Sequence, residues 1–228
     1  LGIIPGIKVD KGLSPLAGAH EVETWCKGLE GLAERTAEYY KQGARFAKWR
    51  AVITIGDTIP SDACIYSNAH ALTRYASLCQ ESGLVPIVEP EVLMNGNHTI
   101  EICYEISKRT LNIVFEQLMM HQVILEGIVL KPNMIISALD CPEQADVEKV
   151  ADMTSKCLKD CVPAEVGGIA FLSGGQSSDL ATEHLNWMNN KYSNDMPWNL
   201  TFSYGRALQH DALNAWRGEK WDEGQQAF

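Results

Sequence analysis

The stretch Glu126-Gly-Ile-Val-Leu-Lys-Pro-Asn133 joins a short apolar run to a lysine and a proline. The run predicts a buried strand over Glu126–Lys131, and Pro132 fixes the backbone directly after it. A lysine at the end of a buried strand is desolvated, which disfavours the ammonium form and frees the amine to attack a carbonyl group. Lys131 is therefore the candidate nucleophile. The alternative is a lysine whose ammonium group extends to solvent at the rim of the sheet.

Five other segments have the same apolar, β-branched character, and longer segments with helical periodicity separate them. This alternation is typical of βα units, in which amphipathic helices cover a parallel sheet. Strands are predicted over Gly6–Asp10, Phe46–Ile53, Leu84–Glu89, Gly167–Leu172 and Leu200–Tyr204. Helices are predicted over Glu21–Tyr40, Asn68–Gln80, Thr99–His121, Asp146–Lys159, Ser178–Asn189 and Arg206–Trp216.

The spacing of the predicted strand ends indicates how the units are arranged. Charged or polar residues recur there at intervals of about 40 residues, at Lys8, Lys48, Glu89, Lys131 and Ser173. A closed barrel of eight such units needs roughly 320 residues, within the range of the TIM (β/α)8 barrel. We therefore expect residues 1–228 to form a single, partial α/β TIM-barrel domain with about six of the eight units. Because the first strand begins so close to Leu1, we also expect an N-terminally incomplete chain.

The composition narrows the range of partners. The 228 residues include 19 Lys and Arg against 29 Asp and Glu, a formal net charge of −10. This charge argues against binding to nucleic acid or to an anionic membrane surface, and no apolar run reaches the roughly 18 residues of a membrane span. Seven cysteines without C-x-x-C spacing predict reduced thiols in a cytoplasmic protein. The six histidines lack ligand spacing, so we expect no metal and no cofactor.

Two predicted strands carry charged residues in alternation. Lys48 and Arg50 are two residues apart, so both side chains project to the same face of their strand. Glu89 and Glu91 repeat this spacing on the next strand, with Pro90 between them. Carboxylates that are buried beside lysines can transfer protons, because the neighbouring charges set their ionisation. The alternative for both strands is an ordinary solvated end.

Two glycine-containing turns are candidates for phosphate binding. Ser173 and Gly174 follow one predicted strand, and Gly205 and Arg206 follow the next. Such turns let backbone N–H groups approach an anion, and a guanidinium group can bind phosphate with two hydrogen bonds. Phosphate sites recur after the last two strands of TIM barrels. A purely structural glycine turn is the alternative for each.

Seven ordered motifs resemble those of class I fructose-bisphosphate aldolases, the Schiff-base, metal-independent type, and the resemblance covers the chain essentially from end to end. The motifs are GIKVDKG at 6–12, PLAG at 15–18, FAKWR at 46–50, VPIVEPE at 85–91, EGIVLKPNM at 126–134, FLSGGQS at 171–177 and LTFSYGRALQ at 200–209.

The resemblance implies reversible cleavage of fructose 1,6-bisphosphate to dihydroxyacetone phosphate and glyceraldehyde 3-phosphate, in glycolysis and gluconeogenesis. It implies that Lys131 forms the imine, that Lys48 lies beside the reacting carbon chain, and that Arg50 lies near the distal phosphate. Glu89 would transfer protons, and Glu91 would support the lysine network.

The resemblance also implies two phosphate subsites and an assembly. Ser173, Gly174, Gly205 and Arg206 would hold the phosphate next to the ketone, and Lys8 would face the other phosphate. Family members are commonly homotetramers, so the resemblance implies a homo-oligomer that binds a phosphorylated sugar.

Two departures from the family pattern leave other functions open. Family members have about two further βα units before the first residue of this chain, one of them with a functional aspartate, and a C-terminal tail that ends in a functional tyrosine. The first alternative is accordingly an inactive aldolase-like fragment that serves as a scaffold or assembly subunit. The second is a barrel isomerase with Glu89 as its base.

Overall fold

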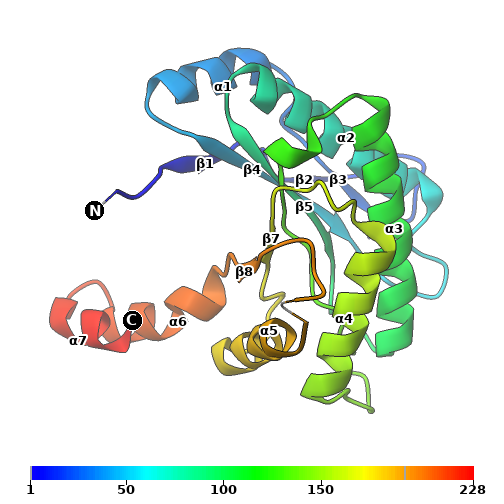
Figure 1. Cartoon of the computed structure of the whole chain (residues 1–228), viewed down its shortest axis with the longest axis vertical. Coiled ribbons are helices and arrows are strands. Elements are labelled where there is room, and N and C mark those ends of the chain that lie inside the picture. Colours follow the sequence, from blue (N-terminus) through cyan, green and yellow to red (C-terminus); the bar gives the residue numbers. More distant parts are fainter. Residues whose placement is uncertain (1, 193) are drawn as a thin grey trace.

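A sheet of six parallel strands forms the centre of the computed structural model, which describes residues 2–192 and 194–228 (Figure 1). The strands follow the order β1-β4-β5-β6-β7-β8, so within this sheet the strands are neighbours in the order in which the chain forms them. Strands β1 and β8 are the two edges, and the sheet is an open part of a barrel. The six are β1 (Gly6–Lys8), β4 (Phe46–Ile53), β5 (Val85–Val92), β6 (Val129–Leu130), β7 (Ile169–Phe171) and β8 (Leu200–Phe202).

Helices follow the strands along the chain, and α1 to α4 form an arc outside the sheet in Figure 1. They are α1 (Leu32–Lys41), α2 (Asp62–Glu81), α3 (Ile100–Met120), α4 (Val147–Cys161), α5 (Ser178–Tyr192), α6 (Arg206–Trp216) and α7 (Trp221–Ala227). The predicted α/β fold with six parallel strands is confirmed, and a helix follows β4, β5, β6, β7 and β8 in turn. Helix α7 lies beyond the predicted elements.

Capping residues set where three of these helices begin. The side chains of Ser61, Thr99 and Asp146 accept hydrogen bonds from backbone N–H groups in the first turns of α2, α3 and α4, respectively. Each cap satisfies one of the free N–H groups at a helix start. Helix α2 consequently begins at Asp62, earlier than the predicted Asn68.

The prediction of a helix over Glu21–Tyr40 is wrong in its first half. Residues Leu13–Pro15 and Thr24–Cys26 form an antiparallel pair, β2 and β3, and α1 begins only at Leu32. Two glycines explain why no helix forms before Leu32. Gly28 and Gly31 have φ values of 129° and 64°, which residues with a side chain rarely adopt. At Gly28 a Cβ would also lie 2.9 Å from the backbone nitrogen of Lys11.

The strand predicted over Glu126–Lys131 is also shorter than expected. A 3₁₀ turn occupies Leu125–Gly127, and only Val129 and Leu130 form β6. Its pairing with β5 is limited to Ile87 with Val129 and Val88 with Leu130. Lys131 is therefore the first residue after the strand.

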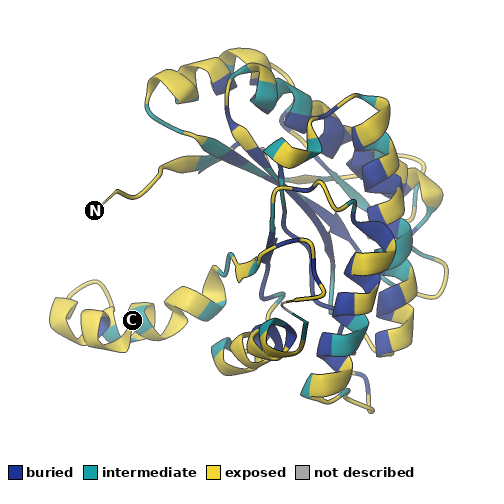
Figure 2. Ribbon diagram, viewed as in Figure 1, coloured by how far each residue is buried: buried dark blue, intermediate teal, exposed yellow. Residues whose placement is uncertain are grey.

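Burial is concentrated between the sheet and α2, α3 and α4, as Figure 2 shows in dark blue. Trp49, Tyr75, Phe115 and Phe171 are among the largest fully buried side chains. All seven cysteines are free thiols and are buried. Helix α6, by contrast, has no buried residue. Within the described residues, the helices are too short or too polar to cross a bilayer.

Candidate active site

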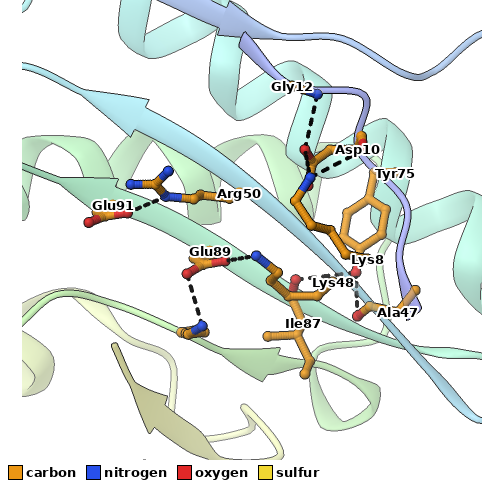
Figure 3. A network of polar contacts seen from close by, with 11 residues as sticks. Lys8, Asp10, Gly12, Ala47, Lys48, Arg50, Tyr75, Ile87, Glu89 and Glu91 are labelled. Atoms are coloured by element: carbon orange, nitrogen blue, oxygen red, sulfur yellow. Dashed lines mark hydrogen bonds and ion pairs between the residues drawn. The ribbon is translucent and has the colours of Figure 1, made fainter. Parts of the chain in front are cut away.

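Glu89 pairs with two lysines in the middle of the sheet. Its Oε2 atom lies 2.8 Å from Nζ of Lys48 on β4, and its Oε1 atom lies 3.0 Å from Nζ of Lys131. The side chains of Glu89 and Lys131 are only 4% and 10% exposed, respectively. One buried carboxylate thus bridges cations from both neighbouring strands (Figure 3).

A second ion pair lies one step further along the same strands. Nε of Arg50 donates a hydrogen bond to Oε2 of Glu91, whose side chain is 7% exposed. Burial opposes the charge on Arg50, but the hydrogen bond and the negative charge of Glu91 outweigh burial and raise the pKa of the guanidinium group. The alternation of Lys48 and Arg50 therefore places both cations on the face where β5 presents its carboxylates, as Figure 3 shows.

Except for Lys48, these side chains border a pocket of about 390 Å³ at the carboxyl ends of the strands. Eight of the ten predicted site residues line it, and so do Leu172 and Ser203, which the sequence left without a role. The eight are Arg50, Glu89, Glu91, Lys131, Ser173, Gly174, Gly205 and Arg206. Residues that are far apart in the sequence are brought together because every parallel strand ends at the same edge of the sheet.

The glycine turn after β7 faces the start of α6. Gly174 and Gly175 have φ values of 64° and 95°, and a Cβ at Gly175 would lie 3.6 Å from Nη2 of Arg206. The carbonyl group of Ser173 accepts a hydrogen bond from the side chain of Gln176 at 2.9 Å. Glycine is favoured at both positions by the backbone conformation.

The two remaining predicted residues, Lys8 and Lys48, lie outside the lining of the pocket. Lys48 reaches the site through its ion pair with Glu89. Lys8 is the β1 partner of Lys48, and its Nζ lies 2.5 Å from Oδ1 of Asp10. The Lys8 side chain is 53% exposed, so it occupies the open edge of the site (Figure 3).

Two supporting residues were assigned no role from the sequence. Asp10 is buried and accepts hydrogen bonds from Nζ of Lys8 and from the Gly12 backbone at 3.2 Å. The buried hydroxyl group of Tyr75 donates to the carbonyl group of Ala47 at 2.7 Å and lies 3.2 Å from that of Ile87. Asp10 could have been found from its place two residues after Lys8, whereas the contact of Tyr75 depends on packing of α2.

The part of the chain that the structure describes holds no cluster of three or more His, Cys, Asp or Glu side chains suited to a metal ion. The chemistry that these groups can perform is that of an amine next to a carboxylate. Proton exchange between them, and attack of the amine on a carbonyl carbon, need only the side chains present.

The fold and this site define an α/β-barrel protein with a lysine–carboxylate centre at the carboxyl ends of its strands. A family model described as fructose-bisphosphate aldolase class-I matches residues 1–228. The chain belongs to the class I fructose-bisphosphate aldolase family.

Individual relatives agree with this assignment. A probable fructose-bisphosphate aldolase class 1 of Xanthomonas campestris is 58% identical over 94% of this chain and 64% of its own length. The cytosolic fructose-bisphosphate aldolase 4 of Arabidopsis thaliana is 51% identical over 100% of this chain and 58% of its own.

A solved structure extends the agreement to three dimensions. It contains the fructose-bisphosphate aldolase of Plasmodium falciparum in complex with TRAP and a small-molecule inhibitor, and it matches with a TM-score of 0.94 and 48% identity. The match covers 99% of this chain and 64% of the other. The chain therefore spans less than two thirds of the length of these three relatives.

Proposed function

We propose that the protein is a fructose-bisphosphate aldolase, a lyase that cleaves fructose 1,6-bisphosphate reversibly through a Schiff base on Lys131. The observation that supports this most directly is the buried contact of 3.0 Å between Nζ of Lys131 and Oε1 of Glu89. A carboxylate at that distance can take up and return the protons that imine formation requires.

In the proposed reaction, the neutral amine of Lys131 attacks C2 of the open-chain sugar, and the carbinolamine then loses water to form an imine. Glu89 would protonate the departing hydroxyl group. The protonated imine draws electrons from the C3–C4 bond, which breaks as the C4 hydroxyl group gives its proton to the Glu89 carboxylate. Glyceraldehyde 3-phosphate leaves and an enamine remains. Proton return to C3 and hydrolysis of the imine release dihydroxyacetone phosphate and the free lysine.

The other predicted residues would bind and orient the substrate. We assign the phosphate next to the ketone to Ser173, Gly174, Gly205 and Arg206, because they line the same pocket as Lys131. Lys48 would lie beside the carbon chain. Glu91 would hold Arg50 through their ion pair.

The distal phosphate would lie near Arg50 and Lys8. No metal ion or organic cofactor enters this scheme, because the imine itself accepts the electrons. We further propose a cytoplasmic location, in keeping with the cytosolic Arabidopsis relative and seven free thiols, and a homotetramer. Sedimentation of the full-length protein measures the assembly.

Borohydride trapping tests the proposal. The full-length protein, incubated with dihydroxyacetone phosphate and reduced with borohydride, should acquire one stable adduct, on Lys131. Lys131→Met should abolish the adduct and lower cleavage about a thousand-fold or more. Lys8→Met is the matched control and should still be labelled.

Equal labelling of Lys131→Met and the unsubstituted protein would overturn the assignment. A protein that forms no adduct but isomerises a sugar phosphate would instead support the isomerase with Glu89 as its base.

A further inference from the structure

The backbone ladder between β5 and β6 stops next to Lys131. The N–H group of Lys131 donates to the carbonyl group of Val88 at 2.8 Å, and this is the last regular bond between the two segments. In the parallel register, the next donor on β5 would be residue 90 and its acceptor would be the Lys131 carbonyl group. Residue 90 is Pro90, which has no N–H group. The chain after Lys131 therefore lacks this backbone bond to β5.

The side chain of Asn133 restores a hydrogen bond to β5 two residues after Pro90. The same register would pair the N–H group of Val92, at the end of β5, with the backbone carbonyl group of Asn133. Instead, Val92 donates to the side-chain Oδ1 atom of Asn133 at 3.1 Å, in a buried hydrogen bond. The Asn133 amide thus takes the place of the Asn133 carbonyl group in the ladder.

The other end of the same amide is also bound. Nδ2 of Asn133 donates to Oγ of Ser107 on α3 and to the carbonyl group of Met134, each at 3.1 Å. Asn133 is 9% exposed, so water competes weakly for these bonds. One side chain therefore ties the segment after Lys131 to β5 and to α3.

We propose that Asn133 is a positioning residue that holds Lys131 against Glu89 for imine formation. The inference rests on the proposed function and adds a residue to which the sequence and the family assignment gave no role here. Glu89 lies on β5, and Lys131 lies between the last backbone bond, at Val88, and the Asn133 bond to Val92. Removal of the Asn133 amide breaks the hydrogen bond to Val92 and leaves only the backbone bond to Val88. The Lys131 amine then moves relative to the Glu89 carboxylate.

The test compares two buried side chains that bind the same segment. In Asn133→Ala, the rate of adduct formation with dihydroxyacetone phosphate and borohydride should fall about 10- to 100-fold, because a displacement of about 1 Å has effects of this size. The matched control is Thr154→Val, since Oγ1 of Thr154 accepts from the Ile135 backbone at 2.9 Å, two residues beyond Asn133. Both variants should lose stability, but only Asn133→Ala should slow adduct formation.

A second readout does not depend on the aldol reaction. Acetic anhydride labels lysine amines according to their protonation, and mass spectrometry gives the pH profile for Lys131 in each variant. The profile should change in Asn133→Ala and stay unchanged in Thr154→Val. If Asn133→Ala does not fold, Asn133→Ser replaces it. The serine keeps a polar side chain at this position, but that side chain is too short to bind the N–H group of Val92, so the same results are expected.

The outcomes separate the two proposals. An unchanged adduct rate and an unchanged labelling profile in the folded Asn133 variant would overturn the positioning role. The same holds if Thr154→Val slows the reaction as much as Asn133→Ala. If the unsubstituted protein forms no adduct on Lys131, the proposed function fails, and the labelling profile still decides whether Asn133 positions the lysine.

Discussion

Lys131 and Lys8 both lie at the carboxyl ends of parallel strands, and both pair with a buried carboxylate. Lys131 lies in the middle of the sheet, 3.0 Å from Glu89, and its side chain is 10% exposed. Lys8 lies at the edge, 2.5 Å from Asp10, and its side chain is 53% exposed. The same type of residue at the same point of a βα unit therefore has two environments.

The difference shows that the neighbouring strands, more than the strand end itself, determine what a lysine can do. Lys131 has structure on both sides, because β6 lies between β5 and β7. Lys8 has β4 on one side only. A central lysine is suited to covalent chemistry that needs exclusion of water, whereas an edge lysine is suited to contact with a solvated anion.

Glu89→Gln removes the carboxylate on which the central environment depends, and we expect the largest effect here. The buried Lys131 and the half-buried Lys48 lose their partner, so the free energy of unfolding should fall by roughly 3 kcal/mol. If Glu89 transfers protons as proposed, its loss should lower kcat about 10²- to 10⁴-fold. Urea unfolding and cleavage assays measure both. Glu91→Gln, two residues away on β5, is the control, and an equal loss of kcat in it would remove the distinction between the two acids.

Acid should loosen the glycine-turn side of the pocket through His184. Its Nδ1 atom lies 2.7 Å from Oε1 of Gln176, and Nε2 of the same side chain donates to the carbonyl group of Ser173. Burial lowers the pKa of His184 to about 4. The unfolded imidazole titrates near 6.5, so the unfolded state binds more protons between these values. The contribution to stability is complete above about pH 6.5 and falls by roughly 2 to 3 kcal/mol as the pH approaches 4.

Unfolding of His184→Gln at neutral pH and near pH 4.5 tests this expectation. The variant should lose less stability than the unsubstituted protein over that interval. His98, whose pKa burial also lowers, is present in both proteins and cancels. His210→Gln, which removes an exposed imidazole, is the matched control. An equal loss of stability between neutral pH and about pH 4.5 in His184→Gln and in the unsubstituted protein would contradict the expectation.

Lys8→Met should have the smallest effect of these changes, because it removes a lysine at the edge of the sheet rather than a group in its centre. If Lys8 binds the distal phosphate, its loss removes a charge-assisted contact at a partly solvated site, so KM should rise about ten-fold with kcat nearly unchanged. Lys8→Arg should retain most of the affinity. A fall in kcat at constant KM would instead place Lys8 in the chemical step.

Most of the fold could be predicted because strands and helices in βα units have different periodicities. The errors occur where tertiary contacts override the pattern. Residues 21–31 have an acceptable helical pattern, but Gly28 and Gly31 adopt positive φ, and Thr24–Cys26 pairs with Leu13–Pro15. The first half of the predicted strand at 126–131 is a 3₁₀ turn. Neither outcome can be read from periodicity alone.

The candidate site was predictable to the extent that it lies at strand ends. The topology brings eight of the ten named residues to one pocket, and Lys48 reaches it through Glu89. The supporting groups were not predictable in the same way. Asn133 and Tyr75 act through hydrogen bonds to backbone groups on other elements, and such partners depend on the register of strands rather than on local sequence. The catalytic roles themselves remain predictions for the experiments above.

The seven buried thiols can report on local opening of the fold, because each becomes reactive when the structure around it opens. Cys26 is the last residue of β3, and the other six lie on α2, α3 and α4 and in the loop before α4. Burial raises the pKa of Cys26 and of Cys79 to about 12, so these thiols should resist alkylation until their surroundings open. The order in which iodoacetamide modifies the cysteines would then show which of these elements opens most readily and which opens least.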